Sequence, residues 1–504
     1  MSVYFRELFP SNKVIKFRTD FRNTIYDLFL HRKWEITTHE TDWNMCWSEK
    51  DWINEVYDTL SLKNNQFVNH FRNYYELTRK DLLAKNMKRL KKQNEKMKNE
   101  RMKNERMKNE RVKNERVKNE RVKNERVKNE KMNDKKMNDE EELKIIDITP
   151  VTFVLPLEYK LFLEEYKRRG NRTWIMKPIG KSQGKGIFLF NKISQIKSWS
   201  VGCQRDKDIN SGRDAERNKA LDVGRSPERG KDTNRIKVAE LNKSLEGNKE
   251  TELPERPEQY IVQEYIPNPL LIGGKKFDIR LYVLIVSYSP LTIYLYRSGF
   301  ARFSHTYFKN EKNNMSDITM HLTNVSIQKN AEGYDETVGG KWFVRELFLY
   351  MMSRYGSDRI TTLIRDIENC IIQSFLAVHK IIINDKHCFE LYGFDILIDS
   401  NLKPWLIEVN SSPSLSANTK EDYTLKFNML DELMSLINLE MYNLPETDRV
   451  GDFDCIYRKG NRVVPPQPYN FSSHLGAELS GTEHLKQMAK DIKRGMDNEK
   501  SGKP

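Results

Sequence analysis

The 504-residue chain combines 86 basic with 72 acidic side chains, a formal net charge of +14, and only 38% apolar residues. Collagen-like and wholly disordered classes are excluded, because the globular stretches are long enough to bury a large core. Five scattered cysteines without a CxxC pair argue against a disulfide framework and a zinc site. The most apolar run, 281–296, is broken by Ser287, Ser289 and Pro290 and falls short of a bilayer span, so we expect no membrane partner.

Most of the net positive charge lies in one of two low-complexity stretches, and the other is neutral overall. Residues 85–142 carry a net charge of +9, and residues 200–258 carry 13 basic and 13 acidic side chains. Subtracting both from +14 leaves +5 for the rest of the chain. Composition therefore gives little support for a nucleic-acid partner, because the charge does not belong to a folded face.

An aromatic-rich first segment predicts a small α+β domain, which we place at 1–84. Seven pentads follow, beginning with Met97-Lys-Asn-Glu-Arg101, inside a charged spacer at 85–142. A period of five advances about 500° around a helix, so the apolar residues form no stripe. We interpret the spacer as a solvated charged helix or a disordered linker, with an RNA- or microtubule-binding arm as the alternative.

Beyond residue 145, hydrophobic patterning alternates between strand and helix periods. Strands are predicted at 173–176, 186–190, 260–263, 278–287, 291–296, 389–398 and 404–409, and helices at 158–169, 344–355, 361–380 and 423–441. Residues 200–258 combine balanced charge with few aromatics, which predicts a flexible loop inserted into this domain. The mixture of elements predicts an α+β fold.

One predicted hairpin carries the clearest chemical signal. Alternate side chains of a strand share a face, so Glu408 and Asn410 point together while Ile407 and Val409 pack behind them. Asp395 lies on the preceding strand, and pairing of the two strands can bring it beside Glu408 and Asn410. Two carboxylates and an amide oxygen suit a magnesium ion that also contacts nucleotide phosphates, and an ordinary hairpin with polar tips is the alternative.

Further polar residues interrupt the strands that precede this hairpin. Lys177 ends the strand begun at Trp174 and could reach phosphate oxygens as a point charge. The next loop, 180–186, is rich in glycine but is not a GxxxxGK[ST] loop, and a plain hairpin turn is the alternative. Asp278 and Arg280 share a strand face, where a partly exposed ion pair is the simplest interpretation. No nucleophile elbow or HExxH pair is present, so the parts favour a magnesium nucleotide site.

Several segments together resemble the tubulin tyrosine ligase-like family in sequence, order and spacing. They are Trp174-Ile-Met-Lys-Pro178, Ser182-Gln-Gly-Lys-Gly-Ile187, Lys276-Phe-Asp-Ile-Arg280, His321-Leu-Thr-Asn324 and Trp405-Leu-Ile-Glu-Val-Asn-Ser-Ser-Pro413. The resemblance extends back over 69–81 and forward over 449–454, so it covers nearly all of the non-repetitive chain. Within the family the chain is most like the short tubulin polyglutamylases, the ninth and first vertebrate members above all.

The resemblance implies an ATP-grasp ligase core that holds ATP and magnesium between two α+β lobes. The implied partners are tubulin or microtubules and free L-glutamate. ATP would phosphorylate the side-chain carboxylate of a glutamate in a tubulin tail, and the amino group of free glutamate would attack the acyl phosphate. The products would be an isopeptide bond, ADP and phosphate. Activation is needed because a carboxylate is a poor electrophile, and magnesium and cationic side chains offset the developing charge.

The resemblance also assigns roles by position. Magnesium binding falls to Asp395, Glu408 and Asn410, and the catalytic set is Lys177, Asp278, Arg280 and Arg302. ATP binding falls to Lys177, Gln183, Gly184, Gln263, Glu264, Tyr265, Ile266, Lys276, Phe277, Asp278, Thr323 and Asn324. Glutamate binding falls to Arg302, Lys341 and Lys426, whose charge suits an anionic amino acid, although a solvated basic residue is the plain alternative for each.

The predicted organisation has six parts. They are an N-terminal α+β domain (1–84), the spacer (85–142), an ATP-grasp part with the glycine loop (143–199), the insert (200–258), the catalytic ATP-grasp part (259–445) and a C-terminal extension (446–504). The sequence after Asn410 leaves little room for the cationic microtubule-binding domain of longer family members. We therefore expect partner subunits of a polyglutamylase complex to help the chain reach tubulin.

Two other functions stay open at this point. A tubulin glycine ligase would use the same chemistry, and the shape of the amino-acid pocket cannot be read from the sequence. A non-catalytic cytoskeletal adaptor would combine a degenerate ligase fold with the basic repeat, but the intact set of Asp395, Glu408 and Asn410 argues against it. The resemblance places the protein in the cytoplasm and cytoskeleton, at a cilium, flagellum or basal body.

Overall fold

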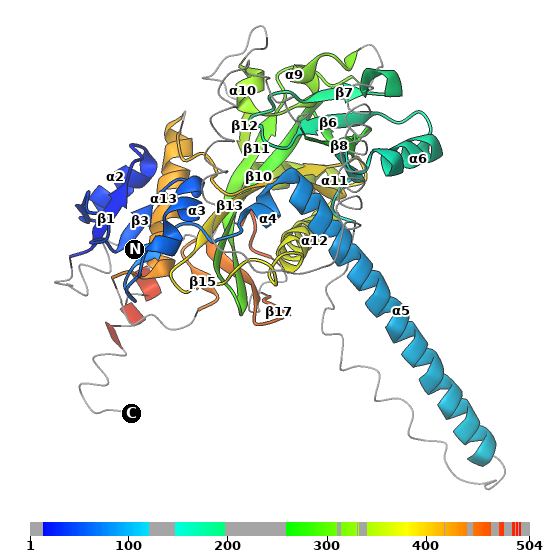
Figure 1. The fold of residues 1–504 in the computed structure, drawn as a ribbon, viewed down its shortest axis with the longest axis horizontal. Helices are drawn as coiled ribbons and strands as arrows, with labels where there is room; N and C mark the ends of the chain where they lie inside the picture. Colours follow the sequence, from blue (N-terminus) through cyan, green and yellow to red (C-terminus); the bar gives the residue numbers. More distant parts are fainter. Residues whose placement is uncertain are drawn as a thin grey trace, which may run out of the picture.

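The computed structural model describes residues 14–119, 147–196, 259–309, 314–329, 331, 340–417, 419–440, 447–464, 473–477 and a few positions from 486 to 494. The predicted insert 200–258, residues 120–142 of the spacer and about half of the C-terminal extension lie outside the described residues. Three sheets and their covering helices make up the described part (Figure 1), which confirms the predicted α+β class.

The largest sheet is built around the long antiparallel hairpin of β10 (Lys275–Tyr288) and β11 (Leu291–Phe303). Its main strand order is β14-β13-β10-β11-β16-β15, and β9, β12 and β17 pair with β10, β11 and β16. These strands are β9 (Leu271–Ile272), β12 (Lys341–Phe343), β13 (Glu390–Ile398), β14 (Pro404–Asn410), β15 (Arg449–Val450), β16 (Phe453–Arg458) and β17 (Asn461–Arg462).

Alternation along β10 divides its side chains between the two faces of this sheet. One face packs beneath α11 (Val344–Tyr355) and α12 (Ser357–Leu376). It buries the odd-numbered apolar side chains Phe277, Ile279, Leu281, Val283 and Ile285. Tyr282 and Leu284 face the opposite way, into a cluster shared with α13 (Lys420–Ile437). The even-numbered polar residues of β10 continue this second face, so the candidate site lies there.

A smaller antiparallel sheet, of order β5-β8-β6-β7, forms a separate lobe. Its strands are β5 (Thr152–Leu155), β6 (Trp174–Pro178), β7 (Phe188–Phe190) and β8 (Tyr260–Glu264). α6 (Tyr159–Arg169) and the 3-10 helix η2 (Ile193–Ile196) cover one face, where the ring centroids of Phe162 and Trp174 lie 5.0 Å apart. Two short helices, α9 (Ile318–His321) and α10 (Val325–Gln328), complete the lobe region.

The N-terminal segment forms a four-stranded parallel sheet of order β2-β1-β3-β4. Its elements are β1 (Lys16–Thr19), α2 (Thr24–His31), β2 (Glu35–Ile36), β3 (Met45–Trp47), α3 (Lys50–Glu55), the 3-10 helix η1 (Tyr57–Thr59), β4 (Phe67–Val68) and α4 (Tyr75–Thr78). Phe17 and Phe29 belong to the same buried cluster as Leu284 and Met429. The segment therefore shares a hydrophobic core with the large sheet and α13.

A 40-residue helix, α5 (Lys80–Asn119), follows and projects away from the body of the protein (Figure 1). Its first turns are anchored by the buried side chains of Leu83 and Met87, so the helix begins before the predicted spacer. Met97 and Met102, in the pentads, are 50% and 42% exposed, which confirms at these positions that the repeat has no buried face. Within this helix each pentad glutamate follows an arginine or lysine by four residues and precedes a lysine by three, and such spacings support an exposed helix.

The other predicted elements recur with shifted ends. α11 matches the predicted 344–355, whereas β11 continues seven residues past the predicted end at Tyr296. The extension includes Arg297, whose guanidinium is buried against Asp452 and Asp454. Gly299 fits in this stretch because a Cβ there would lie 2.3 Å from the carbonyl oxygen of Arg280. These long-range contacts do not appear in the local pattern.

Two sequence-based expectations, about disulfide bonds and about membrane-spanning segments, can be compared with the described residues. The four cysteines that they include, Cys46, Cys370, Cys388 and Cys455, are buried and free. Among the described helices, none has the length and apolar character needed to cross a membrane.

Candidate active site

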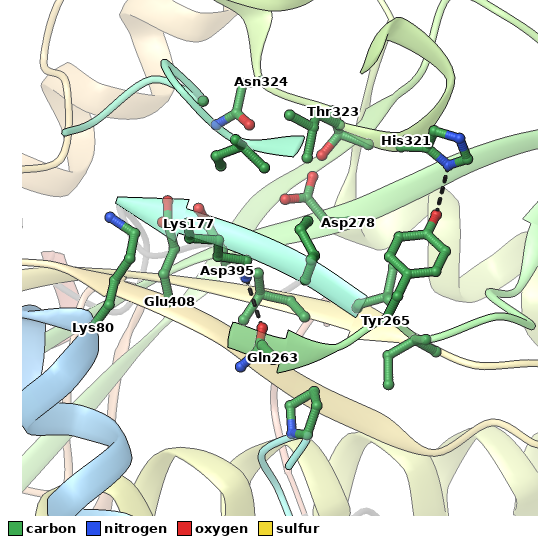
Figure 2. A pocket seen from close by; sticks show the side chains of 18 of the residues that line it. Lys80, Lys177, Gln263, Tyr265, Asp278, His321, Thr323, Asn324, Asp395 and Glu408 are labelled. Carbon is green, nitrogen blue, oxygen red and sulfur yellow. Dashed lines mark hydrogen bonds between the residues drawn. The ribbon is translucent and has the colours of Figure 1, made fainter. Parts of the chain in front are cut away.

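A cavity between the small lobe and the large sheet gathers most of the predicted nucleotide and metal residues (Figure 2). It encloses about 820 Å³, part of which is open to solvent. The predicted residues that line it are Lys177, Gln183, Gly184, Gln263, Glu264, Tyr265, Ile266, Lys276, Asp278, Thr323, Asn324, Asp395 and Glu408. They come from both lobes, so the tertiary fold brings the separate sequence segments to one place. The binding role of each residue stays a prediction.

The cavity also has an apolar wall. Its apolar residues come from β6, the glycine loop, the segment after α9 and the two strands of the β13–β14 hairpin, and include Ile175, Ile187, Leu322, Leu397 and Ile407. Ile175 also packs in a small cluster with Tyr265. An apolar slot next to charged groups can hold a flat base while its phosphates meet the charges.

Phe277 is a predicted nucleotide residue whose side chain lies elsewhere. Its ring is 1% exposed and sits 5.3 Å from that of Phe303, in the core under α11 and α12. Strand alternation explains this position, because its neighbours Lys276 and Asp278 point to the cavity. Its ring therefore contributes to the core rather than to the cavity wall.

The glycine loop between β6 and β7 is held against α10. Gln183 and Gly184 have φ of 60° and 78°, in the left-handed region that favours glycine. A Cβ at Gly184 would lie 2.4 Å from Cδ1 of Ile327, so a side chain there would require Ile327 to move. The Ser326 hydroxyl donates to the carbonyl oxygen of Gln183 over 3.0 Å. The loop therefore closes one side of the cavity, and α10 holds it in place.

Two buried lysines face the cavity, and burial disfavours their charged form. Lys177 donates from Nζ to Oε1 of Gln263 over 2.7 Å, and burial lowers its pKa to about 8 although Glu408 acts in the opposite direction. Lys276 donates to the Tyr265 hydroxyl over 3.1 Å and to the carbonyl oxygen of His321 over 2.7 Å. Burial lowers the pKa of Lys276 to about 7. An anionic ligand in the cavity would stabilise the charged form of both lysines.

Two of the predicted metal ligands face each other across β13 and β14. Asp395 pairs with Glu408 in the strand register, and Nδ2 of Asn410 lies 3.5 Å from Oδ2 of Asp395 and 3.4 Å from Oε1 of Glu408. Turning the Asn410 amide over would present its oxygen instead. Burial and the neighbouring Asp395 raise the pKa of Glu408. Adjacent hard oxygen donors of like charge form a donor set that fits Mg²⁺.

A β-bulge places these residues differently from the simple alternation that the sequence predicts. After the Asp395–Glu408 pair the register shifts, so that Ile396 pairs with Leu406. Val409 packs in the core as predicted, but the prediction for Ile407 was wrong, because this extra residue lines the cavity beside Glu408.

The arginines of the predicted catalytic set hold the carboxylates. Arg280 donates from Nε and Nη2 to Asp395 over 2.5 and 2.9 Å. Arg302 donates to both carboxylate oxygens of Asp278, from Nε over 2.9 Å and from Nη2. The same Nη2 also lies 3.0 Å from Oδ1 of Asp395. Burial tends to raise the pKa of Asp395, but the two guanidiniums outweigh it and hold that pKa well below its usual range.

The predicted ion pair between Asp278 and Arg280 is therefore replaced by pairs across strands. Asp278 stands opposite Arg302, and Arg280 stands opposite Asp395. Directly opposed side chains in an antiparallel sheet lie closer than neighbours two positions apart on one strand. The strand register thus decides the partners.

The predicted glutamate-binding lysines share one buried carboxylate. Nζ of Lys341 lies 3.1 Å from Oδ2 of Asp422, and Nζ of Lys426 lies 3.0 Å from its Oδ1. Lys341 stands opposite Arg302 in the β11–β12 register, so this group continues the charged face of the sheet. Burial lowers the pKa of Lys426. One carboxylate between two ammonium groups leaves a net positive charge.

The cavity residues that sequence reasoning missed include two with titratable side chains, Lys80 and His321. Lys80 begins α5, donates to the carbonyl oxygen of Lys181 over 3.0 Å and points toward Glu408 and Lys177 in Figure 2. His321 lines the opposite end, beside Tyr265 (Figure 2). Both lie in segments whose family resemblance we noted, and that resemblance was the available signal.

Known proteins provide an independent comparison. The model of the family described as "Tubulin-tyrosine ligase family" matches residues 59–448. The chain belongs to the tubulin-tyrosine ligase family. This membership is consistent with an ATP-dependent ligase and with the α+β lobes around the cavity.

Named relatives within this family cover almost the whole chain. The probable tubulin polyglutamylase TTLL9 of Rattus norvegicus is 36% identical over 95% of this chain and 93% of its own length. The protein of the same name from Bos taurus is 38% identical over the same shares. The probable alpha-tubulin polyglutamylase Ttll1 of Tetrahymena thermophila is 36% identical over 89% of this chain and 94% of its own length. The chain is thus similar to polyglutamylases along the N-terminal segment as well as the core.

We expect Lys80→Met to raise the KM for ATP about tenfold, because it removes a cation from the cavity. Initial rates at varied ATP concentration measure this change. Lys85→Met is the matched control, since Lys85 is exposed on the same helix. Equal KM values for the two variants would contradict a nucleotide contact for Lys80.

We expect ATP binding to take up protons near pH 8.5. The pKa values of Lys177 and Lys276, lowered to about 8 and about 7, leave both ammonium groups largely deprotonated there, and nearby phosphates would restore the charge. Titration calorimetry in buffers of different ionisation enthalpy measures the uptake. Lys276→Met should reduce it, and binding without proton uptake would contradict the lowered pKa values.

Proposed function

We propose that the protein is an ATP-dependent tubulin polyglutamylase, which ligates free glutamate to the side-chain carboxylate of glutamates in tubulin C-terminal tails. The observation that carries the proposal is one continuous charged face. It joins the paired carboxylates of Asp395 and Glu408 to Arg280 and Arg302 on the next two strands of the sheet. Family membership and the polyglutamylase names of relatives that span the chain support the same activity.

The cavity suits ATP in its distribution of apolar and charged walls. The base would lie in the apolar slot near Ile175 and Tyr265, with its phosphates toward Lys177 and Lys276. Asp395, Glu408 and Asn410 would hold Mg²⁺, which when bound offsets phosphate charge. Lys177 and Lys276 would stabilise the negative charge on the phosphate oxygens during transfer. This electrostatic stabilisation is stronger in a buried site than in water.

The reaction needs the acceptor carboxylate to be activated. Transfer of the γ-phosphoryl group to a tail glutamate would form an acyl phosphate and release ADP. The neutral amino group of free glutamate would then attack the acyl carbon. As the C–N bond forms, the C–O bond to phosphate breaks and the nitrogen gives up one proton, which the leaving phosphate can accept. Arg280 and Arg302 are fixed by Asp395 and Asp278, so they can orient anionic oxygens near this point without moving.

The charges beyond Arg302 favour glutamate over glycine as the incoming amino acid. Lys341 and Lys426 share Asp422, so this trio keeps one unbalanced positive charge. A second carboxylate on the amino acid can neutralise that charge, and glycine has only one carboxylate. We therefore propose that the glutamate binds next to this trio, on the same charged face of the sheet and beyond Arg302 from the ATP base.

Substrate and location follow from the same proposal. The acidic tail of tubulin on microtubules would be the acceptor, and the protein would act on the cytoskeleton, at a cilium, flagellum or basal body. Partner subunits of a polyglutamylase complex would help it to reach the tail. A purified chain that modifies microtubules robustly on its own would argue against this need for subunits.

We expect the protein, with any partner subunits, to incorporate labelled glutamate but not labelled glycine into microtubules when ATP is present. Glu408→Gln should lower incorporation at least about 100-fold, because it removes a carboxylate from the predicted magnesium set. Glu346→Gln, an exposed residue on α11, is the control. Mass spectrometry of tubulin tails measures both. Glycine-only incorporation would favour the glycine ligase, and unchanged Glu408→Gln activity would refute the metal assignment.

We expect Lys341→Met to raise the KM for glutamate about tenfold and leave the KM for ATP within twofold, because Lys341 lies with Asp422 rather than in the nucleotide cavity. Initial rates at varied glutamate and ATP separate the two constants. Lys420→Met, an exposed change at the start of α13, provides the control. A rise in the ATP constant alone would contradict the glutamate assignment.

A further inference from the structure

A buried chain of hydrogen bonds connects His321 to Lys276. His321 Nε2 lies 3.0 Å from the carbonyl oxygen of Asn314, and its Nδ1 lies 2.9 Å from the Tyr265 hydroxyl. That hydroxyl oxygen lies 3.1 Å from Nζ of Lys276. All three side chains are almost fully buried, with exposed fractions of 4% for His321 and 6% for Tyr265 and Lys276.

The acceptors along this chain define the direction of every proton. A carbonyl oxygen can only accept, so Nε2 of His321 must carry the hydrogen donated to Asn314. Nδ1 of the neutral ring is then an acceptor, and the Tyr265 hydroxyl donates to it. The lone pairs of that hydroxyl are left to accept from the Lys276 ammonium. Each bond thus depends on the tautomer of His321.

The neutral ring is also the form that the surroundings favour. The His321 ring stands edge-on to those of Tyr265 and Phe308, with centroids 5.5 and 5.8 Å apart, in a largely apolar setting. Burial lowers the pKa of His321, and the nearby Lys276 acts in the same direction. A protonated ring would offer a hydrogen at Nδ1 and force the Tyr265 hydroxyl to reverse its bond.

Lys276 is held by three features on the cavity wall. Its ammonium donates to the Tyr265 hydroxyl and to the carbonyl oxygen of His321, and it lies 4.7 Å from the centre of the Tyr265 ring. These two acceptors use two of its three N–H bonds, and the third remains for a ligand in the cavity that Lys276 lines. Without them a long, flexible lysine would sample several rotamers.

We propose that His321 is a positioning residue, which acts through the Tyr265 hydroxyl to hold the Lys276 ammonium in place for an anionic oxygen of the nucleotide. The inference rests on the ATP site of the proposed function and adds a residue that touches neither phosphate nor metal in that proposal. His321 would therefore affect nucleotide affinity much more than the rate of the chemical step.

Two substitutions of His321 separate this role from a purely structural one. His321→Asn places an oxygen near the position of Nδ1, so it can still accept from Tyr265 but loses the bond to Asn314. His321→Gln places an amide near the position of Nε2, so it keeps the bond to Asn314 but loses the acceptor for Tyr265. A positioning role predicts that the Gln variant binds nucleotide more weakly. A structural role would depend on the Asn314 bond, so it predicts the larger effect in the Asn variant.

The experiment measures binding of a non-hydrolysable ATP analogue with magnesium to the full chain by calorimetry, together with the melting temperature. We expect about a tenfold higher Kd for Tyr265→Phe and for His321→Gln, and less than a threefold change for His321→Asn. The Kd of the double variant with both Tyr265→Phe and His321→Gln should be at most about twofold higher than that of either single variant, because both substitutions break the same hydrogen-bond chain. Tyr166→Phe removes a hydroxyl that donates to Asn191 in the same lobe, and it should leave Kd unchanged.

Activity with tubulin supplies the second readout. In the variants that bind ATP weakly, we expect a higher KM for ATP with kcat within about twofold of the native value. Native Kd values in Tyr265→Phe and His321→Gln, or equal losses in the Asn and Gln variants, would overturn the proposal. Because binding is measured without tubulin, failure to glutamylate tails would refute the proposed function and leave this test intact. A native chain that does not bind the analogue would overturn both.

Discussion

The buried carboxylate of Asp395 organises the rest of the site. It accepts two bonds from Arg280, lies 3.0 Å from Arg302 and pairs with Glu408 across the hairpin. A carboxylate buried to 2% exposure would be costly without such partners. Its position depends on β13 lying between β10 and β14, because that order places Arg280, and Arg302 beyond it, on one side of Asp395 and Glu408 on the other. The candidate metal ligands and the cations for the amino acid therefore meet at a single residue.

Burial gives the other half of the site its electrostatic character. Lys177 and Lys276 are held by neutral acceptors, a glutamine amide and a tyrosine hydroxyl, instead of direct carboxylate partners. Their pKa values are lowered by desolvation, so the cavity without an anion leaves two cations poorly stabilised. A polyphosphate would relieve that imbalance. The glycine loop forms part of the same wall, where Gly184 has the positive φ that favours glycine.

The N-terminal segment is part of this arrangement even though a charged repeat follows it in the sequence. Arg32 is buried against Asp431 and Glu440, on α13 and just beyond it, and His70 pairs with the buried Glu390 of β13. These contacts dock the parallel sheet on the large sheet and so position the start of α5. Lys80 consequently reaches the cavity, while Met97, Met102 and Met107, in the described pentads of the same helix, are exposed to solvent. One helix serves both the site wall and the exposed repeat.

The sequence by itself determined the α+β class, most strands and helices, and the hairpin with Asp395 and Glu408, because two-residue alternation and short turns are local properties. It also predicted that the pentads bury no face, since a period of five matches no helix stripe. Only the tertiary structure decided that Arg280 pairs with Asp395 instead of Asp278 and that a bulge turns Ile407 into the cavity. These outcomes depend on strand register and lobe packing, which join residues that are distant along the chain and leave no periodic trace in it.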